Sequence, residues 1–554
     1  MQGERTDDRI RVLHPAAIIH RLKALAPALL LAPIAYDWYF LASHFTPVPW
    51  GDDFTSIVAH AIVTPLRAHL NDIIAFHGLY RFGLVHAFTD LQLLLLGRVH
   101  IGLFFLCSNL ALIGIVLLFW RHFALELLYF VPVAYLLFQL QYWESALWAQ
   151  VSLLYCGTAC VAMLSFHYVT RGSLRGVVVA FGMAMVAMYS FGNGLLVFVV
   201  GLLALAADGR SKRAWWWLGG FAILLVLYFH DIRPDPGIPS ATALLRHPLM
   251  VLRGFFGFVG AMFNVSPYGP AIAFWAGLFL FASYAYLVLV ARLHRANPFL
   301  FCCLTFTFLT AALVAAGRLE IADGYRVFRS RYTFWSALLV TATYLSFVQS
   351  IAVTYRDRFY SVALVCAIAL NILLNRQGAA PAARLVRSIE ISYVEFMANP
   401  DTGLMHTVAP NALINPIYQK ALDTNIIDRP QVDVRALASS RRDDIRPASH
   451  GRMAVQRFES RRLGDVMFCR FYLKKGNPDG GTVFIGLSRP GRSAVFYQCD
   501  FTGNRYYDDV ATIGSGFVAI IPMSELSPDG PREVSICINE NGTLVDYRTT
   551  ETLR

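Results

Sequence analysis

The sequence predicts a mainly α-helical polytopic membrane protein with about eleven transmembrane helices and a C-terminal extracytoplasmic β-sandwich. Of its 554 residues, 56% are hydrophobic and 15% are charged, and the mean hydropathy is +0.50. Soluble domains carry about 25% charged residues, and apolar runs of about 20 residues are long enough to span a bilayer. Residues 453–554 differ, because short β-type runs alternate there with turn signals.

The net charge of +11 is typical of membrane proteins that keep Arg and Lys in cytoplasmic loops, so we expect no nucleic-acid partner. Residues 1–23 are predicted to form a basic cytoplasmic arm. The first apolar run follows this arm without a small-residue cleavage site, which indicates a retained span rather than a signal peptide.

Residues 24–375 form the predicted transmembrane domain. Its apolar runs lie at 24–45, 101–120, 124–140, 147–168, 174–190, 193–208, 215–230, 271–291, 298–316, 332–350 and 359–375. The stretch 174–207 is too long for one span, and we divide it at SFGNG (190–194), where glycine and asparagine favour a turn.

Arginine and lysine in the short loops predict the orientation. With the N-terminal arm inside, the loops around Arg121, Arg171, Arg210, Arg292 and Arg356 are all cytoplasmic and all basic, as the positive-inside rule requires. An odd number of crossings then places the C-terminal part of the chain outside.

The first external loop, 46–100, carries two neighbouring acids, Asp52 and Asp53, in the stretch VPWGDDFTS. A carboxylate near an apolar interface is partly desolvated, which raises its pKa and makes it a better base at neutral pH. Alternatively, one of the two only caps the helix expected from Phe54. Later in this loop, His77 and Arg81 have the i, i+4 spacing of one helix face and either touch a substrate phosphate or sugar or simply lie at the interface.

The external loop 317–331 is richer in arginine than the positive-inside rule predicts. It contains four arginines, Arg318, Arg326, Arg329 and Arg331, against only two acids. Guanidinium groups match phosphate oxygens in a bidentate way, so we favour a phosphate site over headgroup anchoring or local ion pairs.

Other candidate residues lie near the ends of predicted spans. Glu144, between Trp143 and Trp148, could belong to a sugar-stacking wall, although an aromatic belt explains the tryptophans equally well. Asn193 either hydrogen-bonds a substrate or only shapes its turn.

Residues 376–452 are predicted to be a helical and charged connecting region that ends in a linker-like run, SSRRDDIRPASHGR. Residues 453–554 contain the strand-like runs VMFCRFYL, TVFIGLS, SAVFYQCD, GFVAIIP and REVSICI, separated by turn signals. This pattern predicts the β-sandwich, with Phe468, Phe471, Tyr472, Phe496 and Tyr497 in its core.

The stretches WGDDF, YWESALWAQ, SFGNGLL and RSRYTFWS, with an acidic first external loop followed by many spans, resemble the GT-C membrane glycosyltransferases, including uncharacterised bacterial members. The resemblance covers about residues 24–375. It implies a hexosyl- or pentosyltransferase of the bacterial inner membrane that moves a sugar from a polyprenyl-phosphate donor to a cell-envelope glycan, lipid or protein acceptor on the extracytoplasmic face. A WWD-type motif is missing from the sequence, which argues against an oligosaccharyltransferase.

In this interpretation, Asp52 or Asp53 is the catalytic base. Arg329 or Arg331, with Arg318, binds the lipid phosphate, and the neighbouring Tyr332 is a further substrate-binding candidate. A divalent cation, Mg²⁺ or Mn²⁺, stays an open question, and Asp52 or Asp53 would be its ligand. The alternatives are a lipid-linked glycan flippase or transporter, which should show inverted repeats and charges at the bilayer midplane, and a polysaccharide polymerase or ligase.

Overall fold

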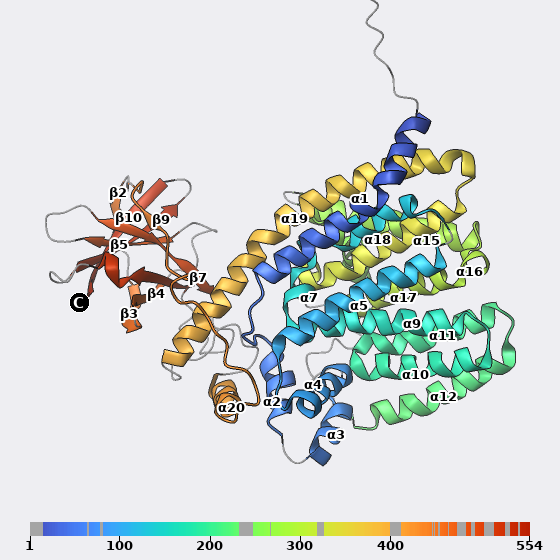
Figure 1. Cartoon of the computed structure of the whole chain (residues 1–554), viewed down its shortest axis with the longest axis horizontal. Coiled ribbons are helices and arrows are strands. Elements are labelled where there is room, and N and C mark those ends of the chain that lie inside the picture. The colour runs from blue at the N-terminus through green and yellow to red at the C-terminus, as the bar shows by residue number, and fades with distance from the viewer. Residues whose placement is uncertain are drawn as a thin grey trace, which may run out of the picture.

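The computed structural model describes residues 15–63, 66–77, 81–123, 125–231, 247–265, 268–317, 326–398, 411–445, 447, 449–451, 455–463, 465–473, 483–488, 494–503, 515–526, 532–540 and 543–553. These residues form a large helical body, a long helix that leaves it, and two β-sheets beside the end of that helix (Figure 1).

As far as residue 423, the secondary-structure elements of the described chain are helices, including short 3₁₀ or π turns marked η. In order they are α1 (Pro15–Ser43), η1 (Phe54–Val58), α2 (Ala59–Ala61), α3 (Leu66–Ile74), α4 (Gly83–Leu96), α5 (Ile101–His122), η2 (Leu127–Phe130), α6 (Val131–Leu137), η3 (Leu140–Tyr142), α7 (Trp143–Leu147), α8 (Ala149–Ser152), η4 (Leu153–Gly157), α9 (Thr158–Val169), α10 (Leu174–Ser190), η5 (Gly192–Gly194), α11 (Leu195–Ala207), α12 (Ser211–Phe229), α14 (Pro248–Val259), η6 (Ala261–Phe263), α15 (Gly269–Leu289), α16 (Leu293–Ala296), α17 (Pro298–Gly317), η8 (Arg326–Phe328), α18 (Ser330–Ser350), α19 (Val353–Ala398) and α20 (Asn411–Asp423).

Among the described residues, six helical stretches are long and apolar enough to cross a membrane. They are Lys23–Ser43, Ile101–His122, Ala149–Val169, Gly269–Leu289, Pro298–Gly317 and Val353–Val394. Helices also lie at the predicted positions 174–190, 193–208, 215–230 and 332–350, as α10, α11, α12 and α18. The chain is therefore a mostly helical protein with several candidate membrane spans.

The predicted run 124–140 differs, because its helix is short. Helix α6 ends at Leu137, and Gln139 is extended. Two asparagines of α19 supply the hydrogen bonds that the broken helix loses: Asn371 donates to the carbonyls of Tyr135 and Phe138, and the Asn375 side chain accepts from the Leu140 amide. These hydrogen bonds satisfy backbone groups that would otherwise be buried without a partner.

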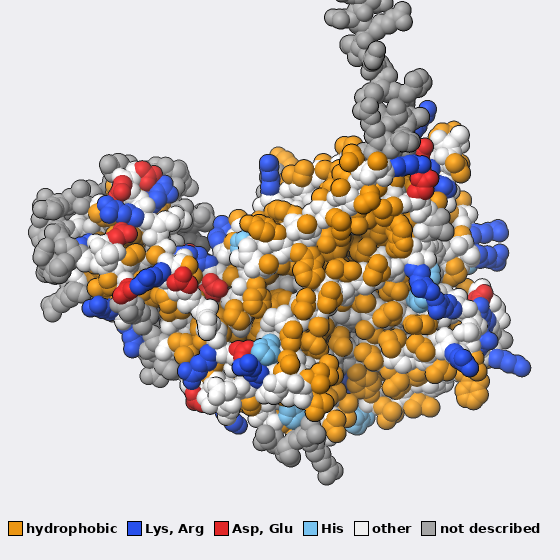
Figure 2. Space-filling model, viewed as in Figure 1, with side chains coloured by type: hydrophobic (Ala, Val, Ile, Leu, Met, Phe, Trp, Pro, Cys, Tyr) orange, Lys and Arg blue, Asp and Glu red, His pale blue; other side chains and the backbone are white. Residues whose placement is uncertain are grey.

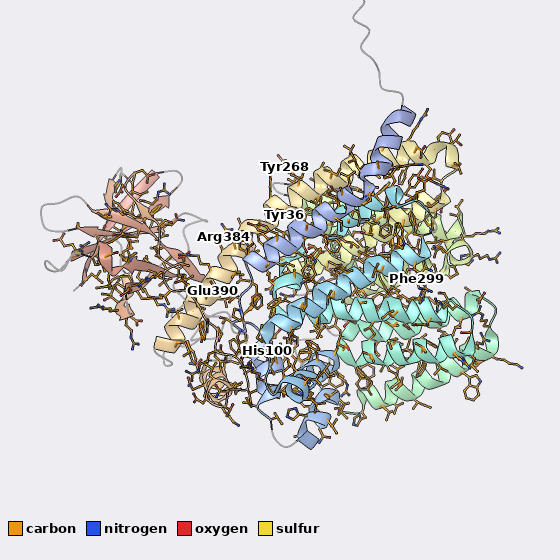
Figure 3. The ribbon with its side chains drawn as sticks, in the orientation of Figure 1. Tyr36, His100, Tyr268, Phe299, Arg384 and Glu390 are labelled. Carbon is orange, nitrogen blue, oxygen red and sulfur yellow. The ribbon has the colours of Figure 1, made fainter. Side chains whose placement is uncertain are left out.

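The loops predicted to be cytoplasmic lie together at one end of the helical body. The His122 carbonyl accepts hydrogen bonds from Asn297 and Gln349, and Arg213 binds the Gly172 carbonyl. In Figure 3, Phe299, which stacks on His122, marks this end, and His100 and Glu390 lie at the other. Exposed hydrophobic side chains cover the flank between the two ends (Figure 2).

The C-terminal region consists of two sheets. Their strands are β1 (Arg441–Arg442), β2 (Ser449–Gly451), β3 (Val455–Leu463), β4 (Val466–Leu473), β5 (Val483–Ser488), β6 (Val495–Gln498), β7 (Asp500–Gly503), β8 (Ser515–Pro522), β9 (Arg532–Glu540) and β10 (Thr543–Leu553), with a 3₁₀ turn η10 (Met523–Glu525) after β8. The six-stranded sheet has the order β1-β6-β5-β9-β10-β2, and the four-stranded sheet has the order β3-β4-β8-β7. All pairs are antiparallel except β10 with β2.

One hydrophobic core joins the two sheets. Cys469 and Phe471 of β4 pack in it with Ile485 of β5 and Ile536 of β9. The alternate residues of β4 face the other way, where Phe468 packs with Ile391 of α19. Burial on both faces explains why VMFCRFYL is an almost continuous apolar run.

The predicted aromatic core residues of this region are largely confirmed. Phe468, Phe471, Phe496 and Tyr497 are buried. The side chain of Tyr472 lies outside the described residues.

Two predicted boundaries fall within regular secondary structure. The break placed between residues 375 and 376 falls inside one continuous helix, α19. The run SSRRDDIRPASHGR is not simply a linker, because it supplies β1 and β2, the two edges of the six-stranded sheet. Charged residues are common on edge strands, where they discourage pairing with another chain, and this is why the run lacks a strand-like pattern.

Candidate functional site

The predicted first-loop acids occupy two different environments. Asp53 is fully buried, and its two carboxylate oxygens accept hydrogen bonds from the backbone amides of Trp50, at 3.2 Å, and Gln150, at 2.9 Å. Burial raises the pKa of Asp53 to about 8, despite those two hydrogen bonds. Asp52 is only partly buried. Asp53 therefore holds the loop against α8, and it does not cap η1 with its side chain.

Gly51 brings the loop into direct contact with Trp148. Its φ of +60° lies in the left-handed region, and a Cβ there would lie 2.2 Å from the Trp148 ring. Trp50 stacks on the same ring, with centroids 4.3 Å apart. Only glycine combines this backbone conformation with so close an approach.

Arg331 lies over the same Trp148 ring, with its guanidinium carbon 5.6 Å from the centroid. Glu144 accepts from the Arg331 amide at 3.0 Å and pairs with its guanidinium at 3.5 Å. The Ser330 hydroxyl donates to the Gln141 carbonyl and accepts from the Glu144 amide. Two stretches almost 190 residues apart are thus joined, and their charged side chains are 15–18% exposed.

The remaining late-loop candidates lie around this junction. Tyr332 is buried, with its ring centroid 5.3 Å from the Arg331 guanidinium and 6.3 Å from the Tyr155 ring. Arg329 precedes α18 and is partly buried. Arg318 lies outside the described residues.

Asn193 lies further inside, in the turn between α10 and α11. Its side chain donates to the Thr310 hydroxyl at 3.2 Å, and its carbonyl oxygen is buried without a hydrogen-bond partner. The turn predicted at SFGNG is confirmed as η5.

His77 and Arg81 do not share a helix face, because α3 ends at Ile74. Arg81 is buried and points to the end of α12, where it binds the Tyr228 carbonyl and the Asp231 carboxylate, each at 2.5 Å. The ring of Phe76 lies 4.2 Å from its guanidinium. These contacts give Arg81 a structural role rather than access to a substrate.

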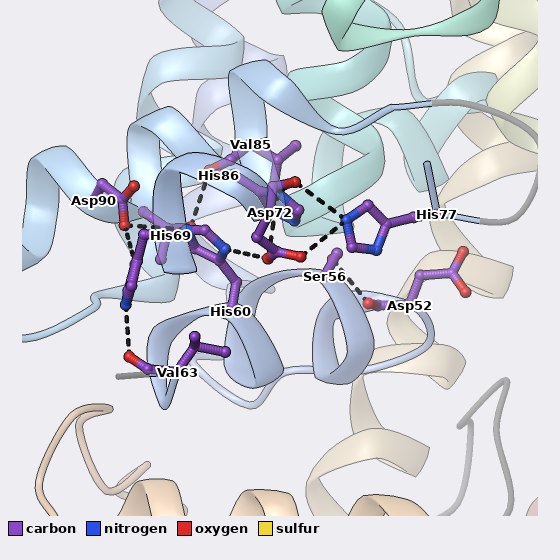
Figure 4. Close-up of polar contacts among 11 residues, drawn as sticks. Asp52, Ser56, His60, Val63, His69, Asp72, His77, Val85, His86 and Asp90 are labelled. Carbon is purple, nitrogen blue, oxygen red and sulfur yellow. Dashed lines mark hydrogen bonds and ion pairs between the residues drawn. The ribbon is translucent and has the colours of Figure 1, made fainter. Parts of the chain in front are cut away.

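His77 belongs instead to a cluster of four histidines and two aspartates, hereafter the His–Asp cluster (Figure 4). Its members are His60, His69, Asp72, His77, His86 and Asp90. They come from α2, α3, α4 and the segment after α3. Asp52 comes just before η1, and its carbonyl accepts a hydrogen bond from the Ser56 hydroxyl of η1. His60 follows on α2, so the cluster begins eight residues after Asp52.

Hydrogen bonds connect the cluster throughout. His60 contacts Asp72 through Nδ1 and Asp90 through Nε2, the latter at 3.0 Å. His69 contacts the same Asp90 oxygen through Nδ1 at 2.6 Å, and the Val63 carbonyl through Nε2 at 2.6 Å. His77 contacts Asp72 at 3.3 Å.

Burial and these contacts shift the pKa values of three cluster members. Although burial raises it, hydrogen bonds from His60 and His77 hold the pKa of Asp72 well below its usual value. Burial, together with the neighbouring His60, lowers the pKa of His86 to about 3. Burial also lowers the pKa of His69, but the Val63 carbonyl and Asp90 outweigh it and raise that pKa overall.

An apolar cavity of about 1240 Å³ lies between α15, α18 and α19. Its lining includes Phe279, Val340, Phe347 and Phe359, and Arg358 lies at the basic-loop end. Helix α18, which carries Arg331 at its first turn, forms one wall of it.

The described residues form a mostly helical protein with several candidate membrane spans. Two polar centres, the junction of Asp52 and Asp53 with Arg331 and the His–Asp cluster, lie at the end of the helical body opposite the basic loops. Comparisons with protein-family models, with curated proteins and with solved structures find no match for this chain. Its function is therefore inferred from its own residues.

Proposed function

We propose that this protein is a membrane glycosyltransferase of the GT-C type, which moves a sugar from a polyprenyl-phosphate donor to a cell-envelope glycan, lipid or protein acceptor. The observation that carries the proposal is the junction of the first loop with the late arginine loop. The Trp148 ring contacts Gly51 on one side and lies under the Arg331 guanidinium. Transfer requires a base and a phosphate-binding group near each other, and Asp52 directly follows Gly51 in the chain.

In the proposed reaction, Asp52 is the base. Its carboxylate takes the proton of the acceptor hydroxyl as that oxygen attacks the anomeric carbon, and the bond from this carbon to the phosphate oxygen breaks. Asp53 is unsuited to this role because both of its oxygens are already occupied in a buried position.

Arg331, with Arg329, binds the departing lipid phosphate and neutralises the charge that develops on it. Glu144 orients Arg331 through the amide and guanidinium contacts described above. A general acid is not needed, because a phosphate so stabilised is a good leaving group.

The apolar cavity supports a lipid-linked donor. Val340 of its lining lies nine residues after Arg331 on α18, which is about 14 Å along a helix. The polyprenyl chain would occupy this cavity with its phosphate towards Arg331.

The proposed topology has eleven crossings in a bacterial inner membrane, with the basic loops in the cytoplasm and the two C-terminal sheets outside as a β-sandwich. The clustering of the basic loops at one end of the helical body supports this orientation. A divalent cation is not required by the steps above.

The experiment that tests this proposal measures transfer in membrane vesicles whose polyprenyl-phosphate sugars carry a radiolabel. We expect the wild type to move label from lipid to acceptor and Asp52→Asn, inserted at the wild-type level, to lose at least about 100-fold in rate, the usual contribution of a general base. Asp423→Asn, an exposed acid of α20, is the control and should transfer normally. Full activity of Asp52→Asn would show that the base is another group.

A further inference from the structure

The His–Asp cluster contains two sets of three side chains that could hold a metal ion, and both include His60. The first is His60, His69 and Asp90, and the second is His60, Asp72 and His86. In each set the ligand atoms lie within 4.8 Å of one another. The orientation of the rings distinguishes the two sets.

The second set is poorly arranged for one ion. The rings of His60 and His86 are stacked, with centroids 4.1 Å apart and planes only 4° from parallel. The nitrogen lone pairs of two stacked rings lie in separate, parallel planes, so they do not converge on one ion.

The first set is well arranged. The planes of His60 and His69 are 69° apart, so the lone pairs of their facing nitrogens can converge. Both nitrogens already face one oxygen of Asp90, at 3.0 and 2.6 Å. Ligands of a tetrahedral ion with bonds of 2.0–2.1 Å are about 3.3 Å apart, so small shifts of these side chains suffice.

In metal-binding histidines, the ring nitrogen that does not bind the metal usually hydrogen-bonds a carboxylate or a backbone carbonyl. Both rings of the first set have such an outer partner. His60 Nδ1 contacts the Asp72 carboxylate, and His69 Nε2 contacts the Val63 carbonyl at 2.6 Å. Such partners fix the tautomer and orient the ring towards the metal. All four nitrogens of the two rings thus contact oxygen atoms, and the ring centroids are 4.7 Å apart.

We propose that His60, His69 and Asp90 bind one zinc-class transition-metal dication, which ties α2, α3 and α4 together at the end of the helical body that carries the first-loop acids. Two imidazoles and one carboxylate suit Zn²⁺ and leave a fourth position for water. The proposal is independent of the proposed glycosyl transfer, since its readout is metal content and not activity.

The test uses the full-length purified protein, stripped with a chelator and titrated with Zn²⁺ or Co²⁺. We expect one equivalent of Zn²⁺ to bind and raise the thermal unfolding midpoint, and Co²⁺ to give the strong visible absorption of a tetrahedral site. His69→Phe and Asp90→Asn should each weaken Zn²⁺ binding by more than about 100-fold, since losing even an outer partner costs 10–100-fold.

Two control variants locate the site. His86→Phe keeps the stacked ring on His60 without its nitrogens, and His100→Gln alters a histidine outside the cluster that pairs with Asp428. Both should bind Zn²⁺ as the wild type does. Loss of binding in His86→Phe, or unchanged binding in His69→Phe and Asp90→Asn, would overturn the assignment.

If the ligand variants fail to fold, Co²⁺ binding by the wild type still tests the proposal. Less than one equivalent of bound Co²⁺, or a weak octahedral spectrum, would then overturn the proposal.

Discussion

The neighbouring acids Asp52 and Asp53 differ in burial. Asp53 is buried against α8, whereas Asp52 is only partly buried. Two adjacent aspartates next to an apolar run can be recognised in the sequence, but their burial cannot, since Gln150 and Trp148 come from almost a hundred residues further on. The partner of a charged residue is thus harder to predict than its presence.

The pH dependence of folding should report on Asp53. Its pKa rises from 3.8 unfolded to about 8 folded, so the folded state binds the extra proton between these values. The contribution of Asp53 to the free energy of unfolding is therefore fully present below about pH 4. It decreases by about 1.4 kcal/mol per pH unit as the pH rises towards 8. Unfolding midpoints of the wild type and Asp53→Asn in detergent, from pH 6 to 8, should diverge accordingly. Parallel curves would mean that Asp53 does not titrate in this range.

Gly51→Ala should destabilise the protein and disturb the tryptophan pair. The left-handed conformation costs a non-glycine residue about 1–2 kcal/mol, and the new methyl collides with the Trp148 ring, which Trp50 holds from stacking. We expect a lower unfolding midpoint and altered tryptophan emission. Gly182→Ala, in α10 with open space around its Cβ position, should be neutral or stabilising. Equal effects of both substitutions would contradict the close packing of Gly51.

The His–Asp cluster illustrates what the sequence does not predict. Its ligands come from three helices at irregular spacing, so no local motif joins them. One signal was present: five of the 15 histidines fall between residues 60 and 100. Arg81 shows the opposite case, since its partner Asp231 follows α12 and the i, i+4 spacing with His77 was misleading.

The pattern of hydrophobic residues predicted the apolar helices and strands, but it missed the strands that are rich in polar residues. The strand-like runs at 466–473, 482–488 and 532–538 correspond closely to β4, β5 and β9. Strands β3 and β10 were missed because VQRFESRRL and TLVDYRTTETL are rich in polar residues. The break after α6 was missed because its hydrogen bonds depend on Asn371 and Asn375 of α19.

We expect Arg387 to stabilise the contact between α19 and the C-terminal sheets. Its guanidinium binds both oxygens of Asp500 at 2.9 Å and the Leu437 carbonyl at 2.6 Å. Arg387→Met removes these charged hydrogen bonds, each worth about 1.5–3 kcal/mol, and should speed amide exchange in β7 and around Leu437. Arg384→Met, an exposed neighbour on α19 (Figure 3), should leave exchange unchanged. Unchanged exchange in Arg387→Met would mean that the apolar contact of Ile391 with Phe468 is sufficient.

At the scale of the whole molecule, the polar centres and the basic loops lie at opposite ends of the helical body. Charge in the loops predicted this separation, because membrane orientation depends on local counts of Arg and Lys. The mutual positions of the two polar centres could not be predicted, since they depend on the packing of η1 against α4 and of α7 against α18.

The most direct test of the substrate site is the binding of a long-chain polyprenyl phosphate, compared with the matching polyprenol, by native mass spectrometry. We predict that the wild type prefers the phosphate by at least about tenfold, the equivalent of 1.4 kcal/mol from one charged contact. Arg331→Gln should abolish this preference, whereas Arg98→Gln, whose arginine pairs with Asp428 away from the junction, should keep it. Equal binding of phosphate and alcohol by the wild type, or an undiminished preference in Arg331→Gln, would contradict a lipid-phosphate site at this junction.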